Sequence, residues 1–146
     1  MVDVITSIDI AAPLNKVTGY AMNQDNAPEW YANIKSIEWR TPKPMTLGSR
    51  FAFVAHFLGR KLSYVYEVVE LKEDHMVMRT ADGPFPMETT YKFEKLSDNS
   101  TRMTLQNRGI PSGFSKLFSP FMAMMMRNAN HKDLRAIKNI IERKNQ

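Results

Sequence analysis

The side chains that most often carry chemistry are few and scattered in this chain. Its three histidines, His56, His75 and His131, lie far apart, and none has the close spacing of a metal site such as His-Glu-x-x-His. A metal site assembled from distant segments stays open, but the spacing itself predicts no metal. The absence of cysteine excludes disulfides, thiolate ligands and cysteine nucleophiles. No Gly-x-Gly-x-x-Gly, P-loop or Gly-x-Ser-x-Gly motif occurs, so we expect no cofactor.

Acid–base chemistry at a carbonyl needs a buried group with a shifted pKa, and three candidates lie in segments with strand patterns. His56 alternates with Phe53, so it points to the opposite face, and a surface histidine is the competing interpretation. Glu67 falls in the phase opposite Tyr66, and we expect it to face solvent. Arg79 lies among apolar residues, where it could anchor a carboxylate ligand or extend its charge to the surface.

The fourth acid–base candidate, Asp133, and its neighbour Asn130 lie on a helical stripe that is otherwise apolar. Both fall within about 40° of Met126 when each residue advances by about 100°. A buried polar group there must find a partner or lose roughly 1–3 kcal/mol through desolvation. We expect Asp133 and Asn130 to pair with the sheet or its turns; the alternative is contact with the polar end of a ligand.

Aromatic residues offer binding chemistry instead. Tyr64, Tyr66 and Tyr91 share one phase of their strands and could present hydroxyl groups inside a cavity, where a few polar contacts orient an apolar ligand. An aromatic core is the competing interpretation.

Four of the eleven methionines fall between Met122 and Met126, close to Phe118. Methionine is flexible and polarizable, so such a cluster suits a pocket for varied apolar shapes, a plastic core or a dimer contact. Around a helix these side chains point in every direction, which indicates a segment enclosed on all sides or in contact with something besides its own sheet. We expect Met122, Met125 and Met126 to point inward and Met124 to lie at a rim or subunit contact.

The elements that must position these residues follow from periodicity. Seven segments alternate apolar and polar residues, and short turns make most of them antiparallel neighbours. The apolar face of such a meander must be covered, and only the C-terminal segment is left to cover it. Strands are predicted at residues 3–10, 35–40, 49–59, 60–71, 75–80, 86–96 and 101–107, short helices at 13–23 and 28–31, and a long helix at 120–143.

Length and charge bound the remaining possibilities. The 146 residues fit one domain, residues 1–146. No signal peptide or run of roughly 20 apolar residues is present, so we expect a cytoplasmic protein without a transmembrane segment. The net charge is +5, with 9 basic and 2 acidic residues from Arg102 onward. This basic segment indicates a solvated helix face; peripheral membrane contact stays open, and we expect no nucleic-acid partner.

Several stretches resemble one known family. "IDIAAPLNKVTGYAMNQDNAPEW" is similar to its opening, a strand ending in Ala-Pro followed by a helix and then Asp and Trp. "LGSRFAF" and "YEVVEL" resemble two of its strands, and "GPFPMETTYKFEKLSDNSTRMTL" its last hairpin. "GFSKLFSPFMAMMMRNANHKDLRAIKNIIE" resembles its closing helix. In this ordered set, which spans almost the whole chain, the protein resembles the START-like (SRPBCC) superfamily and its polyketide cyclase/dehydrase-like branch.

The resemblance implies an α+β helix-grip fold, in which a seven-stranded antiparallel sheet wraps around a long C-terminal helix, with two short helices after the first strand. It implies an elongated apolar cavity between sheet and helix, with Trp30 near its mouth. It does not transfer a reaction, because the superfamily shares no universal catalytic residue. The predicted ligand-binding residues are Trp30, Phe51, Phe53, Tyr64, Tyr66, Met87, Tyr91, Met103, Phe118, Met122, Met125 and Met126.

Three classes of function stay open at this point. The first is a non-catalytic carrier or sensor of a hydrophobic small molecule, such as a lipid, a polyketide or an aromatic compound. The second is a cofactor-independent cyclase or dehydratase that uses His56, Glu67, Arg79 or Asp133. The third is a module that docks to a membrane or a protein through its basic helix. In each case the protein could be a monomer or a homodimer.

Overall fold

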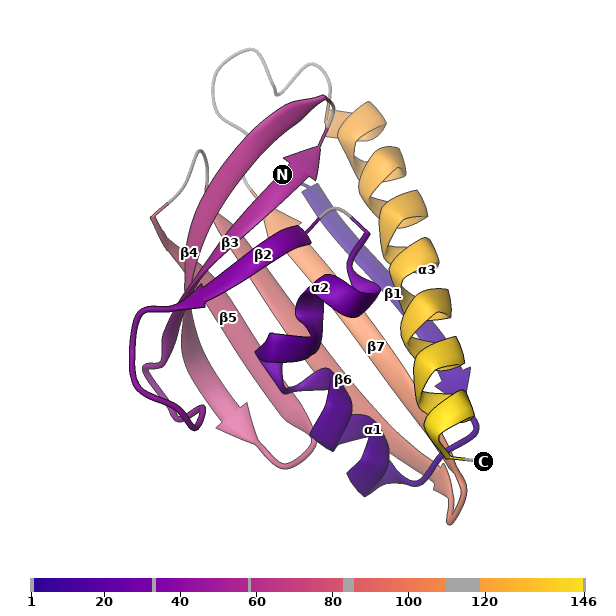
Figure 1. Ribbon diagram of the computed structural model, residues 1–146. Coiled ribbons are helices and arrows are strands. Elements are labelled where there is room, and N and C mark those ends of the chain that lie inside the picture. The colour runs from indigo at the N-terminus through magenta and orange to yellow at the C-terminus, as the bar shows by residue number, and fades with distance from the viewer. Residues whose placement is uncertain (1, 33, 58, 83–85, 110–118, 146) are drawn as a thin grey trace.

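The computed structural model describes residues 2–32, 34–57, 59–82, 86–109 and 119–145. Within these residues the order of elements is the predicted one: a strand, short helices, six further strands and a long helix (Figure 1). The elements are β1 (Val2–Ile10), α1 (Leu14–Ala21), the 3-10 helix η1 (Gln24–Asn26), α2 (Ala27–Trp30), β2 (Ile34–Trp39), β3 (Arg50–Phe57), β4 (Arg60–Lys72), β5 (His75–Asp82), β6 (Met87–Ser97), β7 (Ser100–Gly109) and α3 (Ser119–Lys144).

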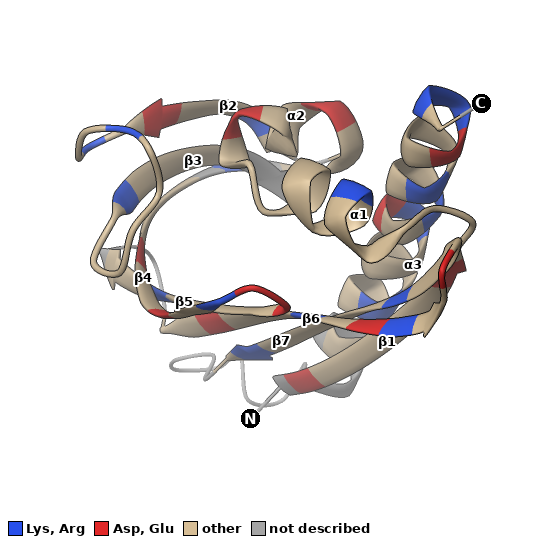
Figure 2. Cartoon of the chain, turned by 90° about the horizontal axis from the view of Figure 1, so that it is seen from below, with Lys and Arg blue, Asp and Glu red and all other residues tan. Residues whose placement is uncertain are grey.

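The strands form one antiparallel, seven-stranded sheet in the order β1-β7-β6-β5-β4-β3-β2. Strands β2 to β7 follow one another as neighbours, whereas β1 pairs along its whole length with β7. Seen from below, the sheet curls, with α3 on one side of its concave face and α1 and α2 between α3 and the far edge at β2 (Figure 2). This is the helix-grip fold that the resemblance implied.

Alternation along the strands separates an inner from an outer face. Phe51 and Phe53 of β3 are buried, whereas Arg50 beside them is exposed. On β4 the buried residues Tyr64 and Tyr66 recur at the same spacing of two, as a pleated strand requires. Each large side chain removed from water in this way contributes on the order of 1.5–3 kcal/mol.

The long helix α3 packs against β1, α1 and α2 and closes the concave side of the sheet. Leu134, Ile137 and Ile141 recur at helical spacing and are almost fully buried in the core. The C-terminal half of α3 therefore rests directly on the hydrophobic core.

The short helices differ from their predicted bounds. Pro13 precedes α1 as its N-cap and is extended, rather than being the first helical residue. The turn-rich stretch before α2 forms η1, because the side chain of Asn23 accepts a hydrogen bond from the Asp25 N–H at 3.1 Å. Capping by a short polar side chain is a local signal that hydrophobic periodicity does not contain.

Candidate ligand-binding site

The predicted aromatic lining comes together on the inner face of the sheet. Rings of β3 and β4 form a continuous row: Phe51 lies 5.8 Å from Phe53 on β3, and Phe53 lies 5.5 Å from Tyr66 on β4, measured between ring centroids. Tyr66 and Tyr64 follow at 6.0 Å. Of the predicted ligand-binding residues, seven are buried in one hydrophobic cluster: Trp30, Phe51, Phe53, Tyr64, Tyr66, Tyr91 and Met103.

The remaining predicted lining residues have different positions. Met87 is half-buried and packs against the same cluster. Met125 and Met126 on α3 are half-buried, whereas Met124 is 48% exposed, in line with the predicted rim position. Phe118 and the side chain of Met122 lie outside the described residues.

A pair of tyrosine hydroxyls lies at the centre of this interior. Tyr31, just after α2, and Tyr91 of β6 share a hydrogen bond of 2.5 Å between their hydroxyl oxygens. Trp30 stacks on Tyr31 with ring centroids 3.9 Å apart. Burial raises the pKa of Tyr31, Tyr91 and Tyr66 well above the ordinary value, so all three phenols remain protonated at neutral pH and can donate hydrogen bonds.

Buried polar groups accompany the tyrosines. The hydroxyl of Thr89 on β6 donates a hydrogen bond of 2.7 Å to Asn107 Oδ1 on β7, and both residues are buried. The Thr89 side chain also lies close enough to Tyr66 to oppose the rise in its pKa. The sequence analysis did not identify Tyr31, Thr89 or Asn107 as site residues. The only signal for Thr89 and Asn107 was their strand phase, because Thr89 alternates in phase with Tyr91 and Asn107 with Met103.

Three buried side chains in the described part of the chain leave polar atoms without a hydrogen-bond partner. These atoms are Trp30 Nε1, Asn130 Nδ2 and both carboxamide atoms of Gln24. Gln24 lies near enough to Tyr91 to lower the pKa of its hydroxyl, but neither carboxamide atom has the geometry of a hydrogen bond. Such atoms are rare in folded proteins, because a buried polar atom without a partner is costly.

Asp133 links α3 to the short helix α2. Its side chain is buried, 3% exposed, and Oδ1 accepts a hydrogen bond of 3.0 Å from the N–H of Ala32. Burial raises the pKa of Asp133 to about 6, against the effect of that hydrogen bond. Its charge in turn raises the pKa of Tyr31 and Tyr91. A carboxyl with a pKa of about 6 can give up or take a proton near neutral pH.

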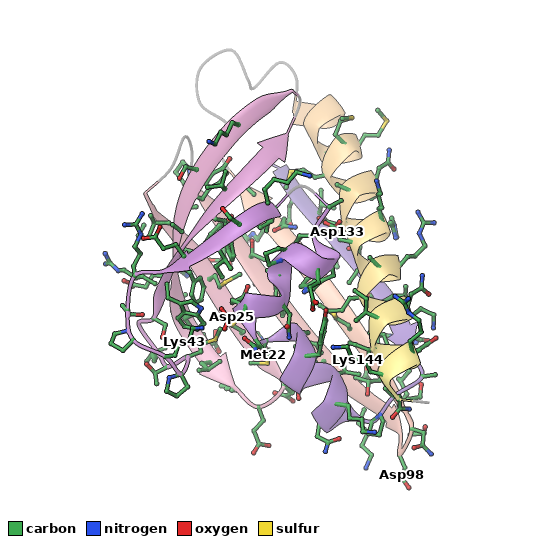
Figure 3. All side chains as sticks on the ribbon, in the orientation of Figure 1. Met22, Asp25, Lys43, Asp98, Asp133 and Lys144 are labelled. Atoms are coloured by element: carbon green, nitrogen blue, oxygen red, sulfur yellow. The ribbon has the colours of Figure 1, made fainter. Side chains whose placement is uncertain are left out.

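A hollow of about 270 Å³ separates α2 from α3 at this point, and Trp30, Tyr31 and Asp133 lie on its wall. Figure 3 shows Asp133 between α3 and the end of α2. The expected pairing of Asp133 is present, whereas the amide nitrogen of its neighbour Asn130 has none.

A larger hollow, about 500 Å³, lies at the lower end of the sheet between α1, the β2–β3 loop and the β4–β5 turn. Asp25 fixes its wall, because its carboxylate accepts hydrogen bonds of 2.7 Å from both Lys43 Nζ and Trp39 Nε1. Figure 3 shows Asp25, Lys43 and Met22 gathered there. Trp39 lines this hollow and packs against Phe51, whereas Trp30 lines the smaller hollow between α2 and α3.

Two of the acid–base candidates, Glu67 and Arg79, lie on the outer face and not beside the aromatic interior. Glu67 accepts a hydrogen bond of 2.7 Å from Arg50 Nε, and Arg79 Nε donates one of 2.7 Å to Glu88. They belong to a row in which opposite charges face each other across six strands. This charge ladder consists of Asp3, Arg108, Glu88, Arg79, Glu67 and Arg50.

His56 lies in β3 opposite Lys61, but its side chain is outside the described residues. Among the side chains that are described, no three His, Asp or Glu residues gather as a metal site would require. In the described part of the chain, no helix is long and apolar enough to cross a membrane. The strongest acid–base candidate that the structure places near the interior is therefore Asp133.

Comparison with known proteins identifies the family. A family model described as "Polyketide cyclase / dehydrase and lipid transport" matches residues 1–142. No curated protein matches the chain.

Among solved structures, the chain is similar to a protein from Thermus thermophilus, with 18% identity, a TM-score of 0.85 and 99% of each chain covered. A START superfamily protein from Mycobacterium smegmatis has 14% identity and a TM-score of 0.81, with 97% of each chain covered. The Zhui aromatase/cyclase from a Streptomyces species has 12% identity and a TM-score of 0.84, covering 99% of this chain and 95% of its own. The chain thus has a START-like fold and belongs to the polyketide cyclase/dehydrase and lipid transport family.

Proposed function

We propose that the protein binds an apolar small molecule, a lipid, polyketide or aromatic compound, between the inner face of the sheet and α3, and acts as its carrier or sensor. The observation that carries the proposal is the set of buried, unpartnered polar atoms of Gln24, Trp30 and Asn130, of which Trp30 belongs to the aromatic cluster. Each such atom costs roughly 1–3 kcal/mol when nothing satisfies it. A ligand with a polar end would supply partners for these atoms and apolar surface for the rings.

The types of these atoms favour a particular ligand chemistry. Trp30 Nε1, Asn130 Nδ2 and Gln24 Nε2 are donors, and only Gln24 Oε1 is an acceptor. Tyr31 and Tyr91 add hydroxyl groups that stay protonated at neutral pH. This excess of donors supports a ligand that presents acceptor oxygens, such as carbonyl, quinone or phenol groups, on an otherwise apolar body.

Tryptophan fluorescence tests the proposal, because the chain has two tryptophans. The variant Trp39→Phe leaves Trp30 as the sole emitter, and Trp30→Phe is its matched control. Titration of W39F with 1,8-dihydroxyanthraquinone should quench the emission saturably, with one molecule bound per chain by native mass spectrometry. Quenching in W30F but not in W39F would move the site to the lower hollow, and no uptake of this compound, palmitate or a sterol would overturn the proposal.

A second candidate function, catalysis of a cyclisation with loss of water, is favoured by Asp133. Its buried carboxyl, with a pKa raised by burial to about 6, lies near the Tyr31–Tyr91 pair. As a carboxylate it could remove a proton from a carbon next to a ketone, while a phenol donates a hydrogen bond to the carbonyl under attack.

An assay with a small diketone distinguishes the enzyme function from the carrier function. In heptane-2,6-dione, Asp133 would take a proton from C1, C1 would add to the C6 carbonyl, and the proton would return to the resulting alkoxide. Loss of a second C1 proton, through Asp133, together with the C6 hydroxyl then releases one water and gives 3-methylcyclohex-2-enone. The enzyme predicts turnover that D133N abolishes while anthraquinone binding persists. Absence of turnover above the rate in buffer, with binding intact, would leave the carrier as the function.

A further inference from the structure

The outer face of α3 carries an unopposed positive charge. Along the helix Arg127, His131, Lys132 and Arg135 are exposed. They fall within about 80° of exposed Met124 when each residue advances by about 100°, so they form one stripe. Figure 2 shows the blue bands of basic residues along α3.

The acidic residues of α3 do not neutralise this stripe. Asp133 is buried and turned toward α2. Glu142 lies two turns beyond Arg135, and its Oε2 accepts hydrogen bonds from Lys138 Nζ at 2.6 Å and from the Ala11 N–H at 2.7 Å. Within the described part of α3, no exposed carboxylate therefore faces Arg127, Lys132 or Arg135.

The outer face of the sheet is organised in the opposite way. Each arginine whose side chain is described there meets a carboxylate: Arg50 with Glu67 at 2.7 Å, for example, and Arg102 with Asp9 at 2.8 Å. Among the described residues, Arg127, Lys132 and Arg135 have no carboxylate within ion-pair distance. The described arginines of the sheet are thus paired within it, whereas these three cations of α3 lie together on one helix and are available to an anionic partner.

The beginning of the same helix is apolar. Met124 is 48% exposed, and Met125 and Met126 are half-buried, directly before the first cation, Arg127. An apolar segment joined to a cationic stripe on one helix is the pattern of helices that lie in the interface of a membrane. A single-stranded nucleic acid is less favoured, because the described residues of the stripe include no Phe, Tyr or Trp on which bases could stack.

We propose that the outer face of α3 binds the surface of an anionic lipid membrane, with Met124 entering the headgroup region and Arg127, Lys132 and Arg135 contacting the lipid phosphates or carboxylates. The inference stands apart from the proposed ligand function, because Arg127 and Arg135 are exposed and line neither of the hollows described above; Lys132 borders the hollow beside Asp133. Each cation near such a surface strengthens binding about fivefold, so removal of all three should weaken it on the order of a hundredfold at low salt.

Co-sedimentation with vesicles tests whether the outer face of α3 binds an anionic membrane. The probes are vesicles of pure phosphatidylcholine and vesicles in which phosphatidylserine replaces about a third of it. We expect the intact chain to bind the anionic vesicles at low salt and to dissociate as sodium chloride screens the charges. R127Q/K132Q/R135Q should lose this binding, and Met124→Ser should weaken it severalfold.

A second triple variant, K35Q/K61Q/K92Q, is the matched control. It removes three exposed lysines from β2, β4 and β6, and both triples lower the formal net charge from +5 to +2. The proposal predicts that this control retains vesicle binding. Circular dichroism should be unchanged in both triples. Because Lys132 and Lys35 also line the hollow beside Asp133, anthraquinone uptake is compared in the double variants R127Q/R135Q and K61Q/K92Q, where it should be unchanged.

Three results would contradict membrane binding by the outer face of α3. Equal losses of vesicle binding in the two triple variants would show that binding depends on net charge alone. No binding of the intact chain to anionic vesicles at low salt would exclude the surface outright. Tighter binding to a duplex DNA than to the vesicles, removed by the α3 triple, would make the stripe a nucleic-acid surface instead.

Discussion

Replacement of Asp133 by asparagine should change how stability depends on pH. The pKa of Asp133 is raised by burial from 3.8 to about 6, so the folded state holds this proton more tightly than the unfolded chain. The folded state therefore gains stability as the pH falls through 6 toward 4 and loses it as the pH rises through the same window. The amide side chain of D133N does not titrate, so this variant removes the contribution.

The size of the effect follows from the difference between the two pKa values. At 1.36 kcal/mol for each pKa unit, the carboxylate destabilises the fold at neutral pH by roughly 3 kcal/mol relative to its protonated form. The amide keeps an oxygen for the Ala32 N–H, though it adds a donor that must itself be satisfied. That cost is the same at every pH, so the change between about pH 7.5 and about pH 4 isolates the titration.

Urea unfolding of wild type and D133N at these two pH values measures how their difference in stability changes with pH. The stability of D133N relative to wild type should be higher at about pH 7.5 than at about pH 4 by roughly 2–3 kcal/mol. D25N is the control with the opposite sign, because hydrogen bonds from Lys43 and Trp39 lower the pKa of Asp25. Its loss should be largest at neutral pH and, for an exposed pair, below about 1 kcal/mol. A pH-independent difference for D133N would show that folding does not raise the pKa of Asp133.

Three further predictions concern the interior and the sheet. Y31F and Y91F should each lower the free energy of unfolding by roughly 1–3 kcal/mol, because each leaves the other hydroxyl without its partner. The double variant should lose less than the sum, and additive losses in urea unfolding would contradict the pairing. A double-mutant cycle of R79Q and E88Q should give a coupling of about 0.2–1 kcal/mol that shrinks at high salt, with anthraquinone binding unchanged; lost binding would return Arg79 to the ligand site. Ile137→Ala should cost roughly 2–5 kcal/mol in the same assay, and a loss below about 1 kcal/mol would show that α3 does not rest on the core there.

The sequence predicts the strands and their inner face well, because a period of two is a local property of the chain. Phe51, Phe53, Tyr64 and Tyr66 share that phase and are buried as the alternation requires. The charge ladder is different in kind. Its members, such as Glu67 and Arg79, become neighbours only through the register of the sheet, which a single strand does not encode.

The polar part of the candidate site is harder to predict. Gln24 and Tyr31 lie in a turn-rich, polar stretch that is typical of the surface, and tertiary packing of η1 and α2 against the sheet buries Gln24. Asp133 was identifiable because a charge on an apolar helical stripe breaks the pattern. Its partner, the backbone N–H of Ala32, was not, since any exposed backbone group could have served.

Photolabelling with 4-hydroxybenzophenone tests most directly whether a ligand enters between sheet and helix. This apolar ketone carries acceptor oxygens and, on irradiation, reacts with nearby side chains, methionine among the most readily. The account predicts saturable labelling of Met103, Met125 or Met126, suppressed by 1,8-dihydroxyanthraquinone. Labelling confined to Met22 and Met45, which line the lower hollow, or no saturable labelling at all, would contradict it.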